Sequence, residues 1–94
     1  MEIDIFGKED CGKCVDAKEK IDTFLSERDL KDKVQVRYFD MESVDGMAEG
    51  AFCDVLKIPT IIIKNKDETV ARWDGGVPET GEVESFLEKE VVNQ

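Results

Sequence analysis

Two of the three cysteines in this 94-residue chain stand close together, in the stretch Cys11-Gly12-Lys13-Cys14. Thiolates are nucleophiles and metal ligands, and redox dithiols, zinc sites and iron–sulfur sites all use the C-x-x-C spacing. The chain contains no histidine, so it lacks the commonest general base and the commonest zinc ligand. The chemistry must therefore come from cysteine, carboxylate or lysine, and the elements around the pair must decide between these uses.

The elements flanking the dithiol favour redox chemistry. An apolar run that ends at Gly7 predicts a strand at residues 2–6, which we expect to be central, and apolar positions at helical spacing predict a helix over residues 11–28. A thiol where a strand passes into a helix gains from unpaired amides and from the positive end of the helix dipole. We expect Cys11 to be the exposed nucleophile, held as a thiolate by amides near Lys13 and Cys14. Cys14, one helical turn onward, is then the sheltered resolving thiol.

Charges beside the pair act in both directions. Lys13 and Lys8 would favour the thiolate of Cys11, although both also suit a solvated surface, whereas Glu9 and Asp10 oppose it. The reduction potential therefore stays open at this stage.

Other uses of the thiols remain as alternatives. Cys11 and Cys14 would also fit as ordinary buried thiols, or as two ligands of a metal shared between chains. Cys53 lies in a predicted second helix among Phe52, Val55 and Leu56. There a free cysteine behaves as a small hydrophobe, and a regulatory or metal role is the alternative.

The remaining elements follow from periodicity and turn residues. In order, they are a strand at residues 34–39, a helix over residues 44–56, a hairpin of strands at residues 59–64 and 69–73 joined at residues 65–67, and a helix from residue 78 onward. Gly46 and Gly50, four apart, permit close packing of the second helix. Thr80 is the expected cap of the last helix, and the residues expected on its apolar face are Val83, Phe86, Leu87 and Val91.

The element order β-α-β-α-β-β-α predicts an α/β fold. A crossover helix makes the first two strands parallel neighbours, and the hairpin adds antiparallel strands. We expect one domain over residues 1–94, with a mixed four-stranded sheet and helices on both of its faces.

Charge and composition narrow the choice of partners. The net charge of −10 comes from 23 acidic and 13 basic residues, so binding to nucleic acid or to anionic lipid is unfavourable. The longest apolar runs, such as Ile61-Ile62-Ile63, are too short to cross a membrane. The amino terminus does not resemble a signal peptide. We expect a cytoplasmic monomer that binds no metal and has no cofactor besides a Cys11–Cys14 disulfide.

Ile58-Pro59-Thr60 at the entrance to the third strand, together with the dithiol and the element order, resembles the thioredoxin superfamily over essentially the whole chain. The resemblance implies a thioredoxin-like fold and a cis Ile58–Pro59 bond beside Cys11 and Cys14. It also implies that the backbone of Ile58 pairs with an extended segment of the substrate, which is strand addition. The alternative for Pro59 is a trans residue that starts an edge strand.

The chain resembles glutaredoxins in length. Lys8 matches their lysine near the glutathione carboxylate, and Gly75-Gly76 matches their glycine pair. However, Gly-Lys stands between the cysteines where dithiol glutaredoxins have Pro-Tyr, and Val77-Pro78 replaces the residues that hold the γ-glutamyl end. Ile5 also stands where thioredoxins carry a buried aspartate, and alternation along the strand should turn Asp4 to the other face.

The sequence therefore predicts a glutaredoxin-like thiol–disulfide oxidoreductase that reduces disulfide-containing protein substrates. Its electron donor is expected to be a flavoprotein reductase or glutathione. The expected catalytic residues are Cys11 and Cys14, and the expected substrate-binding residues are Lys8, Gly12, Lys13, Ile58, Pro59, Thr60, Gly75 and Gly76. The alternatives are a thiolate metal-binding module and an interaction domain on the same fold that binds its partner irrespective of redox state.

Overall fold

The chain folds around a four-stranded mixed sheet with the strand order β2-β1-β3-β4. The structure, a computed structural model, describes residues 1–92, with side chains described as far as residue 87. Its elements are β1 (Glu2–Gly7), α1 (Gly12–Glu27), β2 (Gln35–Asp40), α2 (Val44–Phe52), β3 (Thr60–Asn65), β4 (Glu68–Asp74) and α3 (Thr80–Val92). β1 is parallel to β2 and antiparallel to β3, and β3 is antiparallel to β4. The predicted element order, central first strand and α/β class are confirmed.

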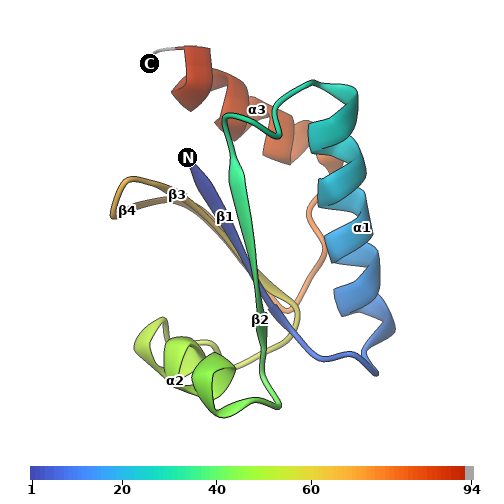
Figure 1. Ribbon diagram of the computed structural model, residues 1–94, viewed down its shortest axis with the longest axis vertical. Helices are drawn as coiled ribbons and strands as arrows, with labels where there is room; N and C mark the ends of the chain where they lie inside the picture. Colours follow the sequence, from blue (N-terminus) through green and yellow to red (C-terminus); the bar gives the residue numbers. More distant parts are fainter. Residues whose placement is uncertain (93–94) are drawn as a thin grey trace.

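The helices cover both faces of the sheet (Figure 1). α1 and α3 lie together on one face, and α2 lies on the other. The main core fills the space beneath α1 and α3, because alternate residues of β1 and β3 point there. Its buried members are Ile3, Ile5, Ala17, Ile21, Phe24, Leu25, Val34, Ile61, Ile63, Val83 and Leu87. No helix among residues 1–92 combines the length and the apolar character needed to span a bilayer.

The start of α3 differs in detail from the prediction. Thr80 is the first residue of the helix, so it is not the cap. Glu79 takes the capping position: its carbonyl accepts from the N–H of Val83, and its own N–H donates to Glu82 Oε2 at 3.1 Å. This is half of a capping box, in which a carboxylate in the first turn reaches back to the cap amide. Val83 and Leu87 are buried as expected, Phe86 is half-buried, and the side chain of Val91 lies outside those described.

α2 packs through its glycines and turns its apolar side chains outward. A Cβ on Gly46 would lie 1.8 Å from the carbonyl oxygen of Asp40, and one on Gly50 would lie 2.5 Å from Met41 Cε. Only glycine fits beside the backbone carbonyl at position 46, whereas a Cβ at position 50 would displace the flexible end of Met41, so the predicted close packing is confirmed. The large apolar side chains of this region face solvent, with exposed fractions of 78% for Val44, 48% for Met47, 84% for Phe52 and 91% for Leu56.

The prediction that this helix continues to residue 56 is wrong. It ends at Phe52, and Cys53 is its C-cap. Asp54 then takes a left-handed conformation with φ 55°, and the N–H of Val55 returns to the carbonyl of Gly50 at 2.7 Å. These are the features of a Schellman cap. Cys53 therefore closes the helix as a half-buried residue, outside the helix in which the sequence placed it.

The face of the sheet beneath α2 carries a buried charge cluster. Asp4 is fully buried and accepts hydrogen bonds from Arg37 at 3.0 and 3.2 Å, and Lys64 Nζ lies 2.9 Å from its second oxygen. Burial alone would raise the pKa of Asp4, but the hydrogen bonds from Arg37 and Lys64 outweigh burial and hold that pKa below its ordinary value. Glu2 also pairs with Arg37, and burial together with the neighbouring Asp4 raises the pKa of Glu2.

We predict that Asp4→Asn lowers the free energy of unfolding by about 2 to 3 kcal/mol at pH 7, because Arg37 and Lys64 lose the anion that they surround. Ionised Asp4 stabilises the fold above its unfolded-state pKa of about 4, and this contribution is lost as the pH falls through the lower folded-state pKa. Urea unfolding from pH 7 to pH 2.5 should therefore show a larger acid-dependent loss of stability in the wild type than in the variant. The exposed Asp32→Asn serves as a control and should behave like wild type; equal acid profiles for the wild type and Asp4→Asn would contradict the prediction.

Candidate active site

The dithiol spans the first turn of α1. Cys11 is the N-cap residue and Gly12 the first residue of the helix, and Cys11 and Cys14 form a disulfide with their Cα atoms 5.2 Å apart. Cys11 is half-buried, whereas Cys14 is completely buried. The N–H of Cys14 donates to Cys11 Sγ at 3.2 Å. One sulfur thus reaches solvent at a helix N-terminus with an amide directed at it, and the other lies behind it.

Gly7 forms the surface against which the buried thiol rests. A Cβ at this position would lie 2.7 Å from Cys14 Cβ and 2.8 Å from Cys14 Sγ, closer than real Cβ contacts allow. Only a residue without a side chain lets the sulfur approach the end of β1 so closely. The strand that ends at Gly7 and the helix that begins at Gly12 are therefore joined through this contact as well as through the loop.

Pro59 comes to the same place from β3. The register pairs Phe6 with Thr60, so Pro59, directly before Thr60, lies at the end of the sheet where β1 ends at Gly7. The Ile58–Pro59 bond is cis, as the resemblance implied. The hydroxyl of Thr60 donates to the carbonyl of Lys57 at 2.6 Å and closes this loop.

The other sequence-predicted site residues fall into two groups. Gly75 has φ 79°, and its N–H donates to the carbonyl of Pro59 at 2.8 Å, so it belongs to the same cluster. Lys8 lines a hollow of about 320 Å³ together with Met41, Met47, Val55, Leu56, Lys57 and Ile58. By contrast, Lys13 is exposed, and a Cβ on Gly12 or Gly76 would meet nothing within 4 Å. The structure assigns no contact to these last three.

Sequence reasoning missed Tyr38. Its hydroxyl lies 3.0 Å from the point where a Cβ on Gly7 would stand, the same point that Cys14 Sγ approaches. Parallel pairing sets Tyr38 opposite Ile5, on the face of the sheet that carries the dithiol. The alternation of β2 would have revealed this side chain once the register with β1 was known. Ile5 is buried in the core, and Asp4 points to the other face, both as expected.

Cys53 is separate from the dithiol. It lies at the end of α2, where its carbonyl accepts from Arg72 Nη1 at 2.6 Å. Nowhere in the described part of the chain do three or more cysteine, aspartate or glutamate side chains come together as a ligand set for a metal ion. The three cysteines therefore do not form one site.

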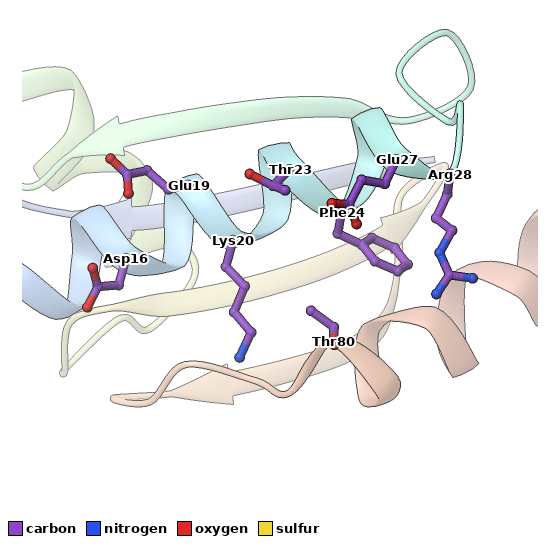
Figure 2. Close-up of a pocket in the computed structure, with 8 residues that line it drawn as sticks. All are labelled: Asp16, Glu19, Lys20, Thr23, Phe24, Glu27, Arg28 and Thr80. Atoms are coloured by element: carbon purple, nitrogen blue, oxygen red, sulfur yellow. The ribbon is translucent and has the colours of Figure 1, made fainter.

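A second hollow lies along α1 (Figure 2). It measures about 400 Å³ and is lined by Asp16, Glu19, Lys20, Thr23, Phe24, Glu27, Arg28 and Thr80. Figure 2 shows these side chains spread along the helix, with Thr80 opposite them at the start of α3. The hollow contains no thiol and mixes acidic with basic side chains. We therefore interpret it as the surface groove between two packed helices.

Comparison with solved structures identifies the fold. Thioredoxin 1 of Thermosipho africanus is 24% identical, with a TM-score of 0.77 and full coverage of both chains. Thioredoxin-2 of a malaria parasite is 16% identical, with a TM-score of 0.79, over 94% of this chain and 81% of that one. Thioredoxin O2 of Arabidopsis thaliana, in its oxidized state, is 15% identical, with a TM-score of 0.71, over 94% of this chain and 72% of that one.

Neither the protein-family models nor the curated proteins give a match to this sequence. At identities below 25%, the structural likeness establishes the fold alone. The chain has the thioredoxin fold, and on it a C-x-x-C disulfide at the start of α1, which supports a redox role in general terms.

We predict that Gly7→Ala disrupts the dithiol, because its Cβ would overlap Cys14. The variant should lose about 1 to 3 kcal/mol of unfolding free energy and form the Cys11–Cys14 disulfide more slowly, measured by quenched thiol alkylation during oxidation. Gly12→Ala is the matched control, since its Cβ meets nothing within 4 Å. Equal effects of the two substitutions would show that Gly7 does not hold Cys14 in place.

Proposed function

We propose that this protein is a thiol–disulfide oxidoreductase that reduces disulfides in other proteins. The observation that carries the proposal is the paired state of Cys11 and Cys14 across the first helical turn. Cys11 is accessible and receives an amide hydrogen bond, and Cys14 is buried behind it. This inequality suits sequential attack, because the accessible sulfur meets the substrate first and the buried one then resolves the mixed disulfide.

The reaction balances as two exchanges. The Cys11 thiolate attacks one sulfur of the substrate disulfide, forms a mixed disulfide and releases the other sulfur as a thiolate, which takes a proton from water. Cys14 then gives up its proton and attacks Cys11 Sγ, and the second substrate sulfur leaves. The substrate gains two electrons and the Cys11–Cys14 pair loses two. The amide of Cys14 and the N-terminus of α1 stabilise the attacking thiolate.

Exposed apolar side chains support a protein as the substrate. Phe52 and Leu56 face solvent, and Leu56 lines the same hollow as Lys8 and Ile58. Apolar groups left this open are typical of surfaces that bind other proteins. A substrate segment that pairs with the backbone of Ile58 would lie next to them.

For the electron donor we propose a flavoprotein reductase in preference to glutathione. Pro78 is buried, and Val77 packs against the main core. Val77 and Pro78 therefore pack against the protein, at the positions where glutaredoxins have the residues that hold the γ-glutamyl end of glutathione. Equilibration of the dithiol against glutathione and against a thioredoxin-type couple would give its potential and the direction of exchange.

Insulin reduction tests the assignment of the two thiols. Cys11→Ser should abolish turnover. Cys14→Ser should accumulate a mixed disulfide at Cys11 that mass spectrometry detects, because the resolving thiol is gone. Cys53→Ser is the control and should keep wild-type activity. Turnover by Cys11→Ser would refute the proposal, and so would zinc or copper bound stoichiometrically to the freshly purified reduced protein and protecting both thiols from alkylation.

The apolar surface has its own prediction. The double substitution Phe52→Ser and Leu56→Ser should raise KM for insulin about tenfold, because buried contacts with the protein substrate are lost. Reaction with a small aromatic disulfide should not change. Val36→Ser, which alters another partly exposed apolar side chain on the opposite face of the sheet, is the matched control. If insulin and the small disulfide respond equally, this surface does not bind the substrate.

A further inference from the structure

The resolving thiol needs a group that stabilises its thiolate, and neither Ile5 nor the adjacent Asp4 of β1 supplies it. Ile5 lies in the apolar core beneath α1. Asp4 is on the opposite face of the sheet, bound by Arg37 and Lys64. Cys14 is completely buried, so water cannot solvate its anion freely. A polar group other than Asp4 is therefore needed near the Cys14 sulfur to stabilise its thiolate.

Tyr38 is placed to do so. Its Oη and Cys14 Sγ lie 3.0 and 2.8 Å from one point, the Cβ position of Gly7. The two atoms therefore lie on the same side of the Gly7 backbone, separated by at most the sum of these distances. A small rotation of the tyrosine, or one bridging water, completes a hydrogen bond between them. Among the described residues no hydrogen bond engages the hydroxyl elsewhere.

The surroundings keep this hydroxyl protonated and in touch with solvent. Burial raises the pKa of Tyr38, and the negative charges of Asp40 and Glu9 raise it further. Lys18 Nζ lies 4.8 Å from the ring centroid and holds the ring by a cation–π contact. Tyr38, Glu9, Asp40 and Lys18 all line a groove of about 490 Å³ that opens to water. The hydroxyl is thus a donor at neutral pH, between the buried sulfur and the solvent.

We propose that Tyr38 is a catalytic residue of the resolving step, in which its hydroxyl donates a hydrogen bond to the sulfur of Cys14 and stabilises the thiolate. This inference rests on the proposed function. The Cys14 thiol passes its proton to the Tyr38 hydroxyl, which releases its own proton to water in the groove. The Cys14 thiolate then attacks Cys11 Sγ, and the bond between Cys11 and the substrate sulfur breaks. The substrate sulfur departs with the electron pair, and the tyrosine ends the step protonated.

The test separates the two exchanges. In a Cys53→Ser background, the reduced protein is mixed with 5,5′-dithiobis(2-nitrobenzoate) in a stopped-flow instrument. One thionitrobenzoate leaves when Cys11 attacks, and a second leaves when Cys14 resolves. Tyr38→Phe should leave the first phase unchanged and slow the second about tenfold at pH 7, as expected for loss of a hydrogen bond to an anion. The difference should vanish at high pH, where Cys14 ionises without help.

Two further measurements exclude a merely structural role. Tyr38→Phe keeps the ring and its contact with Lys18, so a packing role predicts a normal second phase for Tyr38→Phe and a slow one for Tyr38→Leu. Tyr38 is also the only tyrosine, so the tyrosinate absorbance of the protein with its native Tyr38 reports on it even if the variants do not fold. Reduction should move that titration to higher pH, because the neighbouring thiolate holds the proton.

The outcomes are distinct. A second phase that Tyr38→Phe leaves unchanged at every pH would overturn the inference. A tyrosinate titration that is identical in the oxidised and reduced protein would do the same. If the protein with native Tyr38 releases only one thionitrobenzoate and forms no Cys11–Cys14 disulfide, the proposed function itself fails.

Discussion

The contact between the sulfur of Cys14 and the bare backbone of Gly7 determines how the rest of the site is arranged. Because Gly7 has no side chain, the first turn of α1 approaches the end of β1 closely enough to bury one thiol and leave the other at the surface. The register between β1 and β3 places the cis Pro59 at the same end of the sheet. One glycine thus joins a strand, a helix and a loop into a single reactive unit.

The two faces of the sheet are stabilised by different interactions. Beneath α1 and α3 the sheet is apolar and packs by burial of isoleucine, leucine and phenylalanine side chains. Beneath α2 it carries Asp4 with its basic partners, and Gly46 and Gly50 of the helix pack against Asp40 and Met41 at the end of β2. The dithiol belongs to the apolar side. The polar group that we propose there is the neutral hydroxyl of Tyr38, which costs less to bury than an unpaired carboxylate.

Most of the architecture could be predicted from the sequence, because strand alternation, helical periodicity and the dithiol at the strand-to-helix junction all agreed. The end of α2 could not, because Asp54 in a left-handed conformation closes the helix, and aspartate signals this far more weakly than glycine does. The exposure of Phe52 and Leu56 could not be predicted either, because a helical apolar period does not show which face of the segment packs against the sheet. Tyr38 could be recognised as a site residue only from the strand pairing, which sets it opposite Ile5.

α2 packs inward through its glycines and turns its large apolar side chains to solvent. This arrangement separates the residues that stabilise the fold from those that form the surface. Where a helix packs through large apolar residues, a change in those residues affects stability and surface together. Here the inward positions are the glycines, and the outward apolar residues carry little of the core. The outward-facing side chains of this helix can therefore be changed, in evolution or by design, so that the surface near the dithiol differs while the fold is kept.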